Sequence, residues 1–236
     1  MGSGIFFPAL SLVYSLLLIF LCFRKKSIKN KYLKMLVVTN FIGLISEIMC
    51  SFAAFNIDKL PVLSNILLKL YLVYLITWII LFTKYISNIS KTKVNRLKFE
   101  KIVFRIVYVV SCILVFILPI YLFNEGEVRY TYGPSVNVVY TLSFAFIIYC
   151  LLLMFFNINK KVVSRYSSLF ILISLGAFAM IIQSTYPGLL LTTSVSTFVT
   201  FIMYLNTFEN EVLINIENDK KTKLKEGKID NESRSE

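Results

Sequence analysis

Glu47 is the one carboxylate of this sequence that lies deep within a long apolar stretch. A charged side chain in the hydrocarbon of a membrane is costly, so such a residue usually faces other helices and has a partner or a function. Lys69 lies near the outer end of the next apolar stretch, and the two stretches are antiparallel neighbours joined by a short turn, so the two residues can form an ion pair. The pair would either join two helices or belong to a binding or gating site centred on Glu47. Alternatively, Lys69 extends outward to the membrane surface.

Further polar and aromatic residues fall toward the same side of the predicted membrane: Tyr132, Asn137, Gln183 and Tyr186. Small-molecule sites combine apolar walls with a few convergent polar groups, so these residues and Glu47 are candidates for one outward-facing ligand cavity. The alternative for each residue is an ordinary hydrogen bond between helices, worth about 0.6 kcal/mol on average. The segment 124–134 on this side is acidic and aromatic, and is either a ligand contact or a plain connector.

Residue types that enzymes commonly need are scarce in this chain. It contains no histidine and no Cys-x-x-Cys pair, and each of its four cysteines lies in or beside an apolar stretch. Cysteine in such a setting usually packs as a small hydrophobic residue. We therefore predict no disulfide and no metal or other cofactor. With one deep carboxylate and no pair of them, we also expect no self-contained catalytic site.

The composition predicts an all-α fold, a polytopic membrane helix bundle. Hydrophobic residues make up 57% of the 236 residues and charged residues 16%, whereas soluble domains are about half apolar and a quarter charged. Blocks of about 20 apolar residues are long enough to cross a bilayer as helices. We expect seven transmembrane helices, at residues 1–22, 35–55, 65–82, 102–123, 135–156, 167–185 and 188–205.

The positions of the basic residues predict the orientation of this bundle. Of the 25 Lys and Arg residues, 22 fall on one side of the predicted membrane, which the positive-inside rule makes the cytoplasmic side. The N-terminus is then outside and the C-terminus cytoplasmic. The net charge of +12 therefore reflects topology, and we predict no nucleic-acid binding. The last two spans have no charge in their turn, so a re-entrant hairpin is an alternative for them.

We expect two units, a transmembrane sensor domain over residues 1–206 and a cytoplasmic extension over residues 207–236. Apolar residues recur at helical spacing after Phe208, so the last helix is predicted to continue past the membrane. From Gly227 onward the chain is polar and is expected to be disordered.

Four segments carry a resemblance to a known family: YTYGPSVNVVY (130–140), NINKK (157–161), IIQSTYPGLLL (181–191) and FVTFIMYLNTFENE (198–211). They resemble the N-terminal multi-helix membrane sensor region of Firmicutes histidine kinases. In that family the last helix typically ends in a Tyr-x-Thr-x-Glu-Asn-Pro-Asp type sequence and passes into a dimerisation helix. The resemblance implies a location in the bacterial cytoplasmic membrane, a homodimer, and signal output through Tyr204, Glu209 and Asn210.

The chain departs from the family at two points. Glu211-Val212 stands where the family has Pro-Asp, so the last helix can continue unbroken. The phosphoacceptor histidine and the nucleotide-binding domain are absent from this sequence. The resemblance therefore implies either the sensor region of a longer kinase or a free-standing relative that acts through a kinase partner.

We expect a sensor or receptor module of a two-component signal transduction system. An external or membrane-dissolved ligand would bind in the outer half of the bundle and shift a balance between two helix arrangements. The last helix would transmit this shift to a cytoplasmic histidine kinase output. Two other classes stay open: a small carrier or channel subunit, and an accessory protein of a larger membrane complex.

Overall fold

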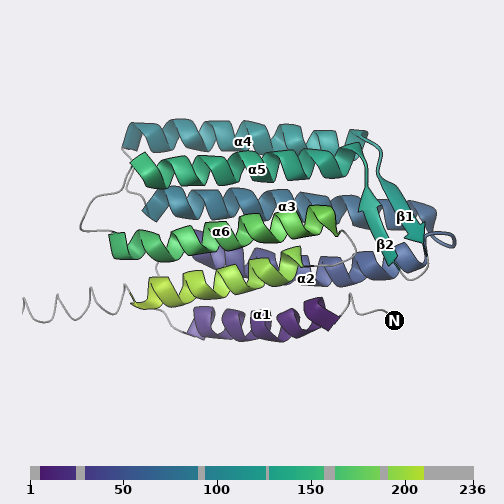
Figure 1. Ribbon diagram of the computed structural model, residues 1–236, viewed down its shortest axis with the longest axis horizontal. Helices are drawn as coiled ribbons and strands as arrows, with labels where there is room; N and C mark the ends of the chain where they lie inside the picture. Colours follow the sequence, from purple (N-terminus) through teal and green to yellow (C-terminus); the bar gives the residue numbers. More distant parts are fainter. Residues whose placement is uncertain are drawn as a thin grey trace, which may run out of the picture.

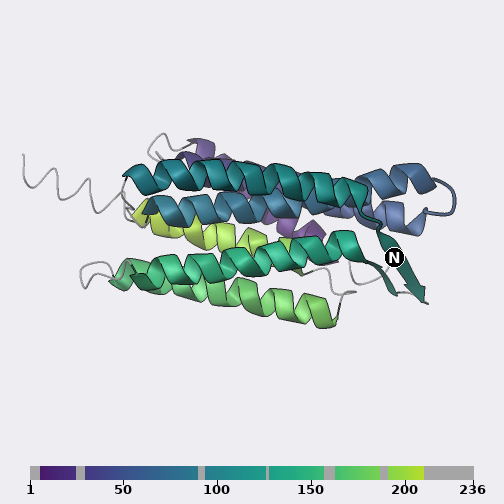
Figure 2. The ribbon, with the colours of Figure 1, turned by 90° about the horizontal axis from the view of Figure 1, so that it is seen from above.

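The computed structural model describes residues 6–24, 30–89, 94–125, 128–156, 163–186 and 191–209. Its labelled elements are α1 (Phe6–Arg24), α2 (Lys31–Phe55), α3 (Pro61–Ile89), α4 (Val94–Ile117), β1 (Tyr121–Glu125), β2 (Val128–Tyr132), α5 (Pro134–Phe156) and α6 (Val163–Thr185). A further helix covers residues 192–209. Within the described parts of the chain there are thus seven helices, one at each predicted position, and they run alongside one another as a bundle (Figures 1 and 2).

The two ends of the bundle differ in what they carry. The α2–α3 turn, the β-hairpin and the start of α1 lie at one end, which we call the hairpin end (Figure 1). The end of α3, the start of α4 and the end of helix 192–209 lie at the other. We call this the basic end, because the described ends of the helices there carry basic residues: Arg24, Lys31, Lys34, Lys84, Lys101 and Arg105.

The bundle has the dimensions and the surface of a membrane protein. Three described helices are long and apolar enough to cross a bilayer: Lys31–Ala54, Pro61–Ile89 and Pro134–Phe156. Large apolar side chains are exposed along the outer faces of the helices, including Ile102, Ile106, Val109 and Ile113 on α4. Soluble monomers rarely expose contiguous apolar areas of this kind. The chain is a multi-pass membrane protein.

Helix α3 forms the centre of the bundle. It contacts α2, α4 and α5, and its buried residues become most frequent in its second half, from Leu72 to Ser87. A helix that is apolar on all sides requires neighbours on all sides, and this half of α3 is the most enclosed part of the helix, whereas Val62, Leu63 and Ile66 near its start are exposed.

The predicted fourth span, residues 102–123, is wrong at its outer end. Helix α4 ends at Ile117, and residues 121–132 form a two-stranded antiparallel hairpin that pairs Tyr121 with Tyr132. Pro119 explains the end of the helix, because proline has no backbone N–H and disfavours helical geometry at the residue before it. The predicted connector 124–134 therefore contains most of a β-hairpin.

Aromatic pairs and one glycine stabilise this hairpin. The rings of Phe123 and Tyr130, which are partners across the strands, lie 4.8 Å apart between centroids. Such cross-strand aromatic pairs are a main source of hairpin stability. Gly133 ends β2 with φ 114°, a conformation that favours glycine, and a Cβ there would lie 2.8 Å from Cδ2 of Tyr121.

Gly43 allows α2 to approach α3 closely. A Cβ atom at this position would overlap the ring of Tyr74, so the tyrosine ring lies directly against the α2 backbone. Small residues at helix contacts permit such close packing in membranes. Gly176 on α6 is the opposite case, since a Cβ there would meet no atom within 4 Å.

We predict that Gly43→Ala lowers the stability of the protein, whereas Gly176→Ala does not. Overpacking the Tyr74 ring costs about 1–3 kcal/mol, while glycine to alanine in an open helix position gains up to about 1 kcal/mol. Thermal unfolding of the purified protein in detergent measures both changes. Equal melting temperatures for the two variants would contradict the close contact.

Candidate functional site

The candidate site lies on one face of α2. Asn40, Gly43 and Glu47 follow the three- and four-residue spacing that places side chains on the same side of a helix. The helix begins with Asn30, whose side-chain oxygen accepts hydrogen bonds from the backbone N–H of Tyr32 (3.0 Å) and of Leu33 (3.3 Å). This capped helix presents its polar face to α3 and to helix 192–209.

Glu47 is bonded by two other helices. Its side chain is 2% exposed. The Tyr71 hydroxyl on α3 donates to Oε1 at 3.1 Å, and the Thr193 hydroxyl donates to Oε2. Thr193 lies in the first turn of helix 192–209, where free backbone N–H groups and the helix dipole favour a negative charge. The carboxylate therefore connects α2, α3 and the last described helix at one point.

Asn40 makes a second connection, nearly two turns toward the basic end. Its amide nitrogen donates to the Thr197 hydroxyl at 2.8 Å, and its amide oxygen accepts from the Ser196 hydroxyl at 2.7 Å. The Tyr74 hydroxyl lies 3.3 Å from the same Ser196 oxygen. All four side chains are buried, so α2, α3 and helix 192–209 are again joined by polar groups. We call the side chains of Asn40, Glu47, Tyr71, Tyr74, Thr193, Ser196 and Thr197 the polar cluster.

Gln183 caps the start of helix 192–209. Its side-chain oxygen accepts from the backbone N–H of Leu191 at 2.9 Å and of Thr192 at 3.3 Å. The first N–H groups of a helix have no partner within that helix, so a side chain of α6 supplies it here. Figure 1 places this start inside the bundle, short of the hairpin end that α2 and α3 reach. Backbone N–H groups at a helix start inside the bundle cannot bond to water, so they need such a partner.

The other end of helix 192–209 is also attached to α3. The Tyr85 and Thr207 hydroxyls lie 2.8 Å apart, and the Tyr204 side chain is 4% exposed. The rings of Tyr204 and Phe208 stack at 6.4 Å between centroids. Glu209 is exposed, and Asn210, the third residue expected to carry the output, lies outside the described residues.

The possible Glu47–Lys69 ion pair does not form. The Lys69 ammonium donates to the Phe116 backbone carbonyl at 2.7 Å, while Glu47 is bonded to Tyr71 and Thr193. The reason is helical geometry, because Lys69 and Tyr71 are two residues apart on α3 and point to nearly opposite sides. The length of the turn would allow either residue to approach Glu47, and it is Tyr71 that bonds to it.

The other predicted ligand-binding residues separate into two groups. Gln183 is 9% exposed and joins the polar cluster indirectly, through the start of helix 192–209. Tyr132 on the hairpin, Asn137 on α5 and Tyr186 after α6 are exposed, and none of these three bonds to Glu47 in the described parts of the chain. Whether they contact a ligand stays a prediction.

Two features were missed from the sequence. The hydroxyl residues of helix 192–209 were not recognised as partners, although Thr193, Ser196, Thr197 and Thr200 repeat at helical spacing. A second buried carboxylate, Glu100 on α4, was overlooked among basic neighbours. It is 7% exposed and accepts from the Ser87 hydroxyl at 2.5 Å and the Tyr149 hydroxyl at 2.7 Å.

The polar cluster is a connected set of hydrogen-bonding groups. The hydroxyls of Thr193 and Tyr71 donate to the Glu47 carboxylate, and Asn40 bonds to the hydroxyls of Ser196 and Thr197. Among the described residues, no group of three or more His, Cys, Asp or Glu is placed to hold a metal ion. What the arrangement offers chemically is hydrogen bonding between a buried carboxylate, an amide and hydroxyls on three helices.

We predict that Thr193→Val destabilises the fold by about 1–2 kcal/mol, because it removes a hydrogen bond to a buried carboxylate. Thr141→Val is the matched control, since Thr141 is exposed on α5. Unfolding in mixed micelles of increasing denaturing detergent measures both variants. If the two substitutions shift the transition equally, the Glu47–Thr193 bond does not contribute to stability.

Comparisons with known proteins return no relative. No protein-family model, no curated protein and no solved structure matches this chain.

Proposed function

We propose that this protein is a membrane sensor or receptor module that transmits a signal through helix 192–209 to a cytoplasmic histidine kinase output. The observation that supports the proposal best is the way this helix is held. Its first turns are attached to α2 by bonds at Glu47 and Asn40, and to α6 by a bond at Gln183. The Tyr74 hydroxyl attaches them to α3. Its other end reaches the basic end of the bundle (Figure 1).

A buried hydrogen-bond network can carry coupling between helices when it has two discrete arrangements. Each arrangement holds the helices in a defined position, and a ligand can favour one of them. A ligand that changes the surroundings of Glu47 therefore acts on the start of helix 192–209 directly, through the Thr193 hydroxyl. Such a ligand shifts the helix only if its affinity differs between the two arrangements.

The proposal includes the orientation inferred from charge. We infer from the positive-inside rule that the basic end lies in the cytoplasm of a bacterial cell and that the hairpin end lies outside. Glu47 lies nearer the hairpin end of α2, so a ligand from outside or from the outer leaflet would approach it first. The kinase domain or kinase partner would receive the signal beyond Glu209, in the expected output segment.

A carrier is the second candidate, and one observation favours it. Asn40, Glu47 and Ser196 form a buried line of polar groups inside the bundle, as a path for a small solute would require. Proteoliposomes that contain the purified protein distinguish the two classes. A carrier moves solute across the vesicle membrane, and a sensor does not.

We predict that Glu47→Gln changes the basal output of a fusion between this chain and an autophosphorylating kinase domain by several-fold. The substitution keeps the size of the side chain but removes the charge that the Thr193 and Tyr71 hydroxyls bind. Incorporation of labelled phosphate in membranes measures the output.

Asp58→Asn is the matched control for this fusion, because Asp58 is an exposed acid at the turn between α2 and α3. Its output should equal that of the unchanged fusion. Unchanged phosphorylation in Glu47→Gln, Gln183→Ala and Asp58→Asn alike would remove the support for the proposal.

We predict opposite accessibility for two single cysteines in a background without the four native ones. Asp58→Cys should react with a membrane-impermeant maleimide in intact cells, and Lys101→Cys only after permeabilisation. Both positions are exposed and lie toward opposite ends of the bundle. The reverse pattern would place the hairpin end in the cytoplasm.

A further inference from the structure

Three positively charged side chains meet where α3 and α4 pack together at the basic end. Lys101 and Arg105 are exposed and four residues apart on α4, so they share one face of that helix. Lys84 on α3 is half-buried, and its charge lies close enough to interact with the charges of Arg105 and Lys101. The 2.5 Å hydrogen bond from Ser87 to Glu100 fixes the two helices at this level. We call Lys84, Lys101 and Arg105 the cation cluster.

The cation cluster has no bonding partner in the described part of the chain. None of its three side chains forms an ion pair or a hydrogen bond with another described residue. Residues 88–99, which connect the two helices, contain four Lys or Arg residues and no Asp or Glu. Like charges that the fold holds together repel one another, so the cluster favours an anion from outside the chain.

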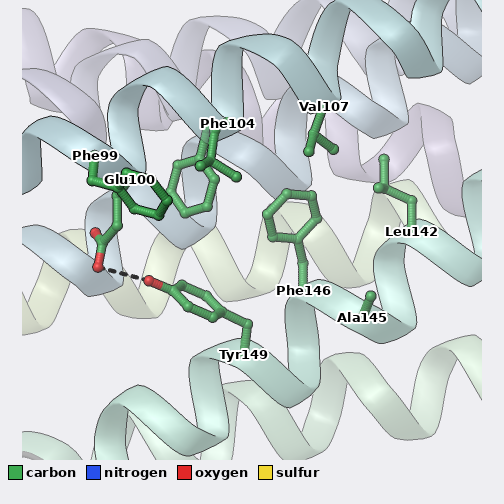
Figure 3. A pocket seen from close by; sticks show the side chains of 9 residues that line it. Phe99, Glu100, Phe104, Val107, Leu142, Ala145, Phe146 and Tyr149 are labelled. Carbon is green, nitrogen blue, oxygen red and sulfur yellow. Dashed lines mark hydrogen bonds between the residues drawn. The ribbon is translucent and has the colours of Figure 1, made fainter. Parts of the chain in front are cut away.

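Glu100 offsets part of this charge without bonding to the cluster. Its carboxylate accepts from the Ser87 hydroxyl and, at 2.7 Å, from the Tyr149 hydroxyl. Figure 3 shows it among the side chains that line a pocket between α4 and α5, directed toward Tyr149. Lys101 and Arg105 follow it by one and five residues, so they lie on another side of α4. Three positive charges and one negative charge leave a net charge of +2.

The depth of the cation cluster matches that of lipid phosphate groups. Helix α3 has 29 residues and is therefore about 44 Å long at about 1.5 Å per residue. A bilayer with its head groups is about 40–45 Å thick around a hydrocarbon core of about 30 Å. Lys84 lies five residues, or about 8 Å, from the end of α3 at Ile89. This is the level at which the head groups meet the hydrocarbon.

Apolar side chains continue from the cluster along α4. Val109, Ile113 and Ile117 follow Arg105 at four-residue intervals, which form a ridge along a helix, and all three are exposed. The distance from Arg105 to Ile117 along the helix is about 18 Å, slightly more than the half-thickness of the hydrocarbon core, about 15 Å. Cations followed by an apolar ridge are complementary to a lipid with an anionic head.

We propose that the cation cluster binds the phosphate group of an anionic phospholipid, whose chain lies along the ridge from Val109 to Ile117. Basic residues between transmembrane helices bind such head groups, Arg through paired hydrogen bonds and Lys through its charge. The phosphate gives Lys84 a partner, as the Phe116 carbonyl does for Lys69 nearer the other end of α3. This site is separate from the polar cluster and does not depend on the proposed signalling function.

The test is native mass spectrometry of the full-length protein, released from a mild detergent that contains a titrated lipid. One probe is phosphatidylglycerol, which has a net negative charge. The other is phosphatidylcholine of the same chains, which has the phosphate but no net charge. We expect saturable binding of one phosphatidylglycerol, at a concentration at least about tenfold below that needed for phosphatidylcholine.

Matched variants test whether the cation cluster is the site. Lys84→Gln and Arg105→Gln should each weaken the binding of phosphatidylglycerol about fivefold and leave that of phosphatidylcholine nearly unchanged. Lys31→Gln is the control, because Lys31 is an exposed lysine of α2 at the same end of the bundle. This control should change neither affinity.

A charge reversal tests the same site through stability. Arg105→Glu places a carboxylate four residues from Lys101 and close to Lys84, so the chain then supplies its own anion. Phosphatidylglycerol should raise the melting temperature of the unchanged protein in detergent, and it should not raise that of Arg105→Glu.

Equal affinity for the two lipids overturns the proposal, because the protein then does not recognise an anionic head. An equal loss of affinity in Lys31→Gln and Lys84→Gln also overturns it, because the lipid then responds to surface charge in general. Displacement of bound phosphatidylglycerol by inorganic phosphate would assign the cluster to free phosphate and overturn the lipid assignment. If Lys84→Gln does not fold, Lys101→Gln, at an exposed position, takes its place and decides the question.

Discussion

A carboxylate enclosed by apolar helices has to be surrounded by hydrogen-bond donors, and Glu47 obtains its donors from two other helices. This requirement fixes the positions of α2, α3 and helix 192–209 relative to one another. Gly43 makes it possible, because the absent side chain lets the Tyr74 ring, one turn from Tyr71, lie against the backbone of α2. The close contact between Gly43 and Tyr74 and the bond between Tyr71 and Glu47 therefore depend on the same relative position of α2 and α3.

Helix α3 takes part in a second arrangement of the same kind. Tyr71 bonds to Glu47 near one end of the helix, and Ser87 bonds to Glu100 near the other. The two positions are about 24 Å apart at a rise of about 1.5 Å per residue. One carboxylate thus joins α3 to α2 and helix 192–209, and the other joins α3 to α4 and α5. These bonds define two groups of helices that share α3.

The helix positions were predictable, and the partners of the polar residues were not. Apolar blocks of about 20 residues indicate helices directly, and a carboxylate within one of them identifies Glu47 as unusual. Which residue meets Glu47 depends on the rotation of α3, and that rotation results from packing such as the Gly43–Tyr74 contact. The hairpin was missed because its strands are only five residues long and their aromatic residues resemble the end of a span. The burial of Glu100 was missed because its hydrogen-bond donors, Ser87 and Tyr149, lie on other helices.

Ser196 has one hydroxyl hydrogen and two acceptors within reach. The amide oxygen of Asn40 lies at 2.7 Å on another helix, and the carbonyl oxygen of Thr193 lies at 2.8 Å within its own. When the hydrogen points to Asn40, Ser196 bonds helix 192–209 to α2, and when it points to Thr193 this bond to α2 is lost. Thr193 keeps a second hydroxyl donor in either case, from Thr197. Rotation of this single O–H bond therefore makes or breaks one of the bonds between α2 and helix 192–209, while the Asn40–Thr197 and Glu47–Thr193 bonds remain.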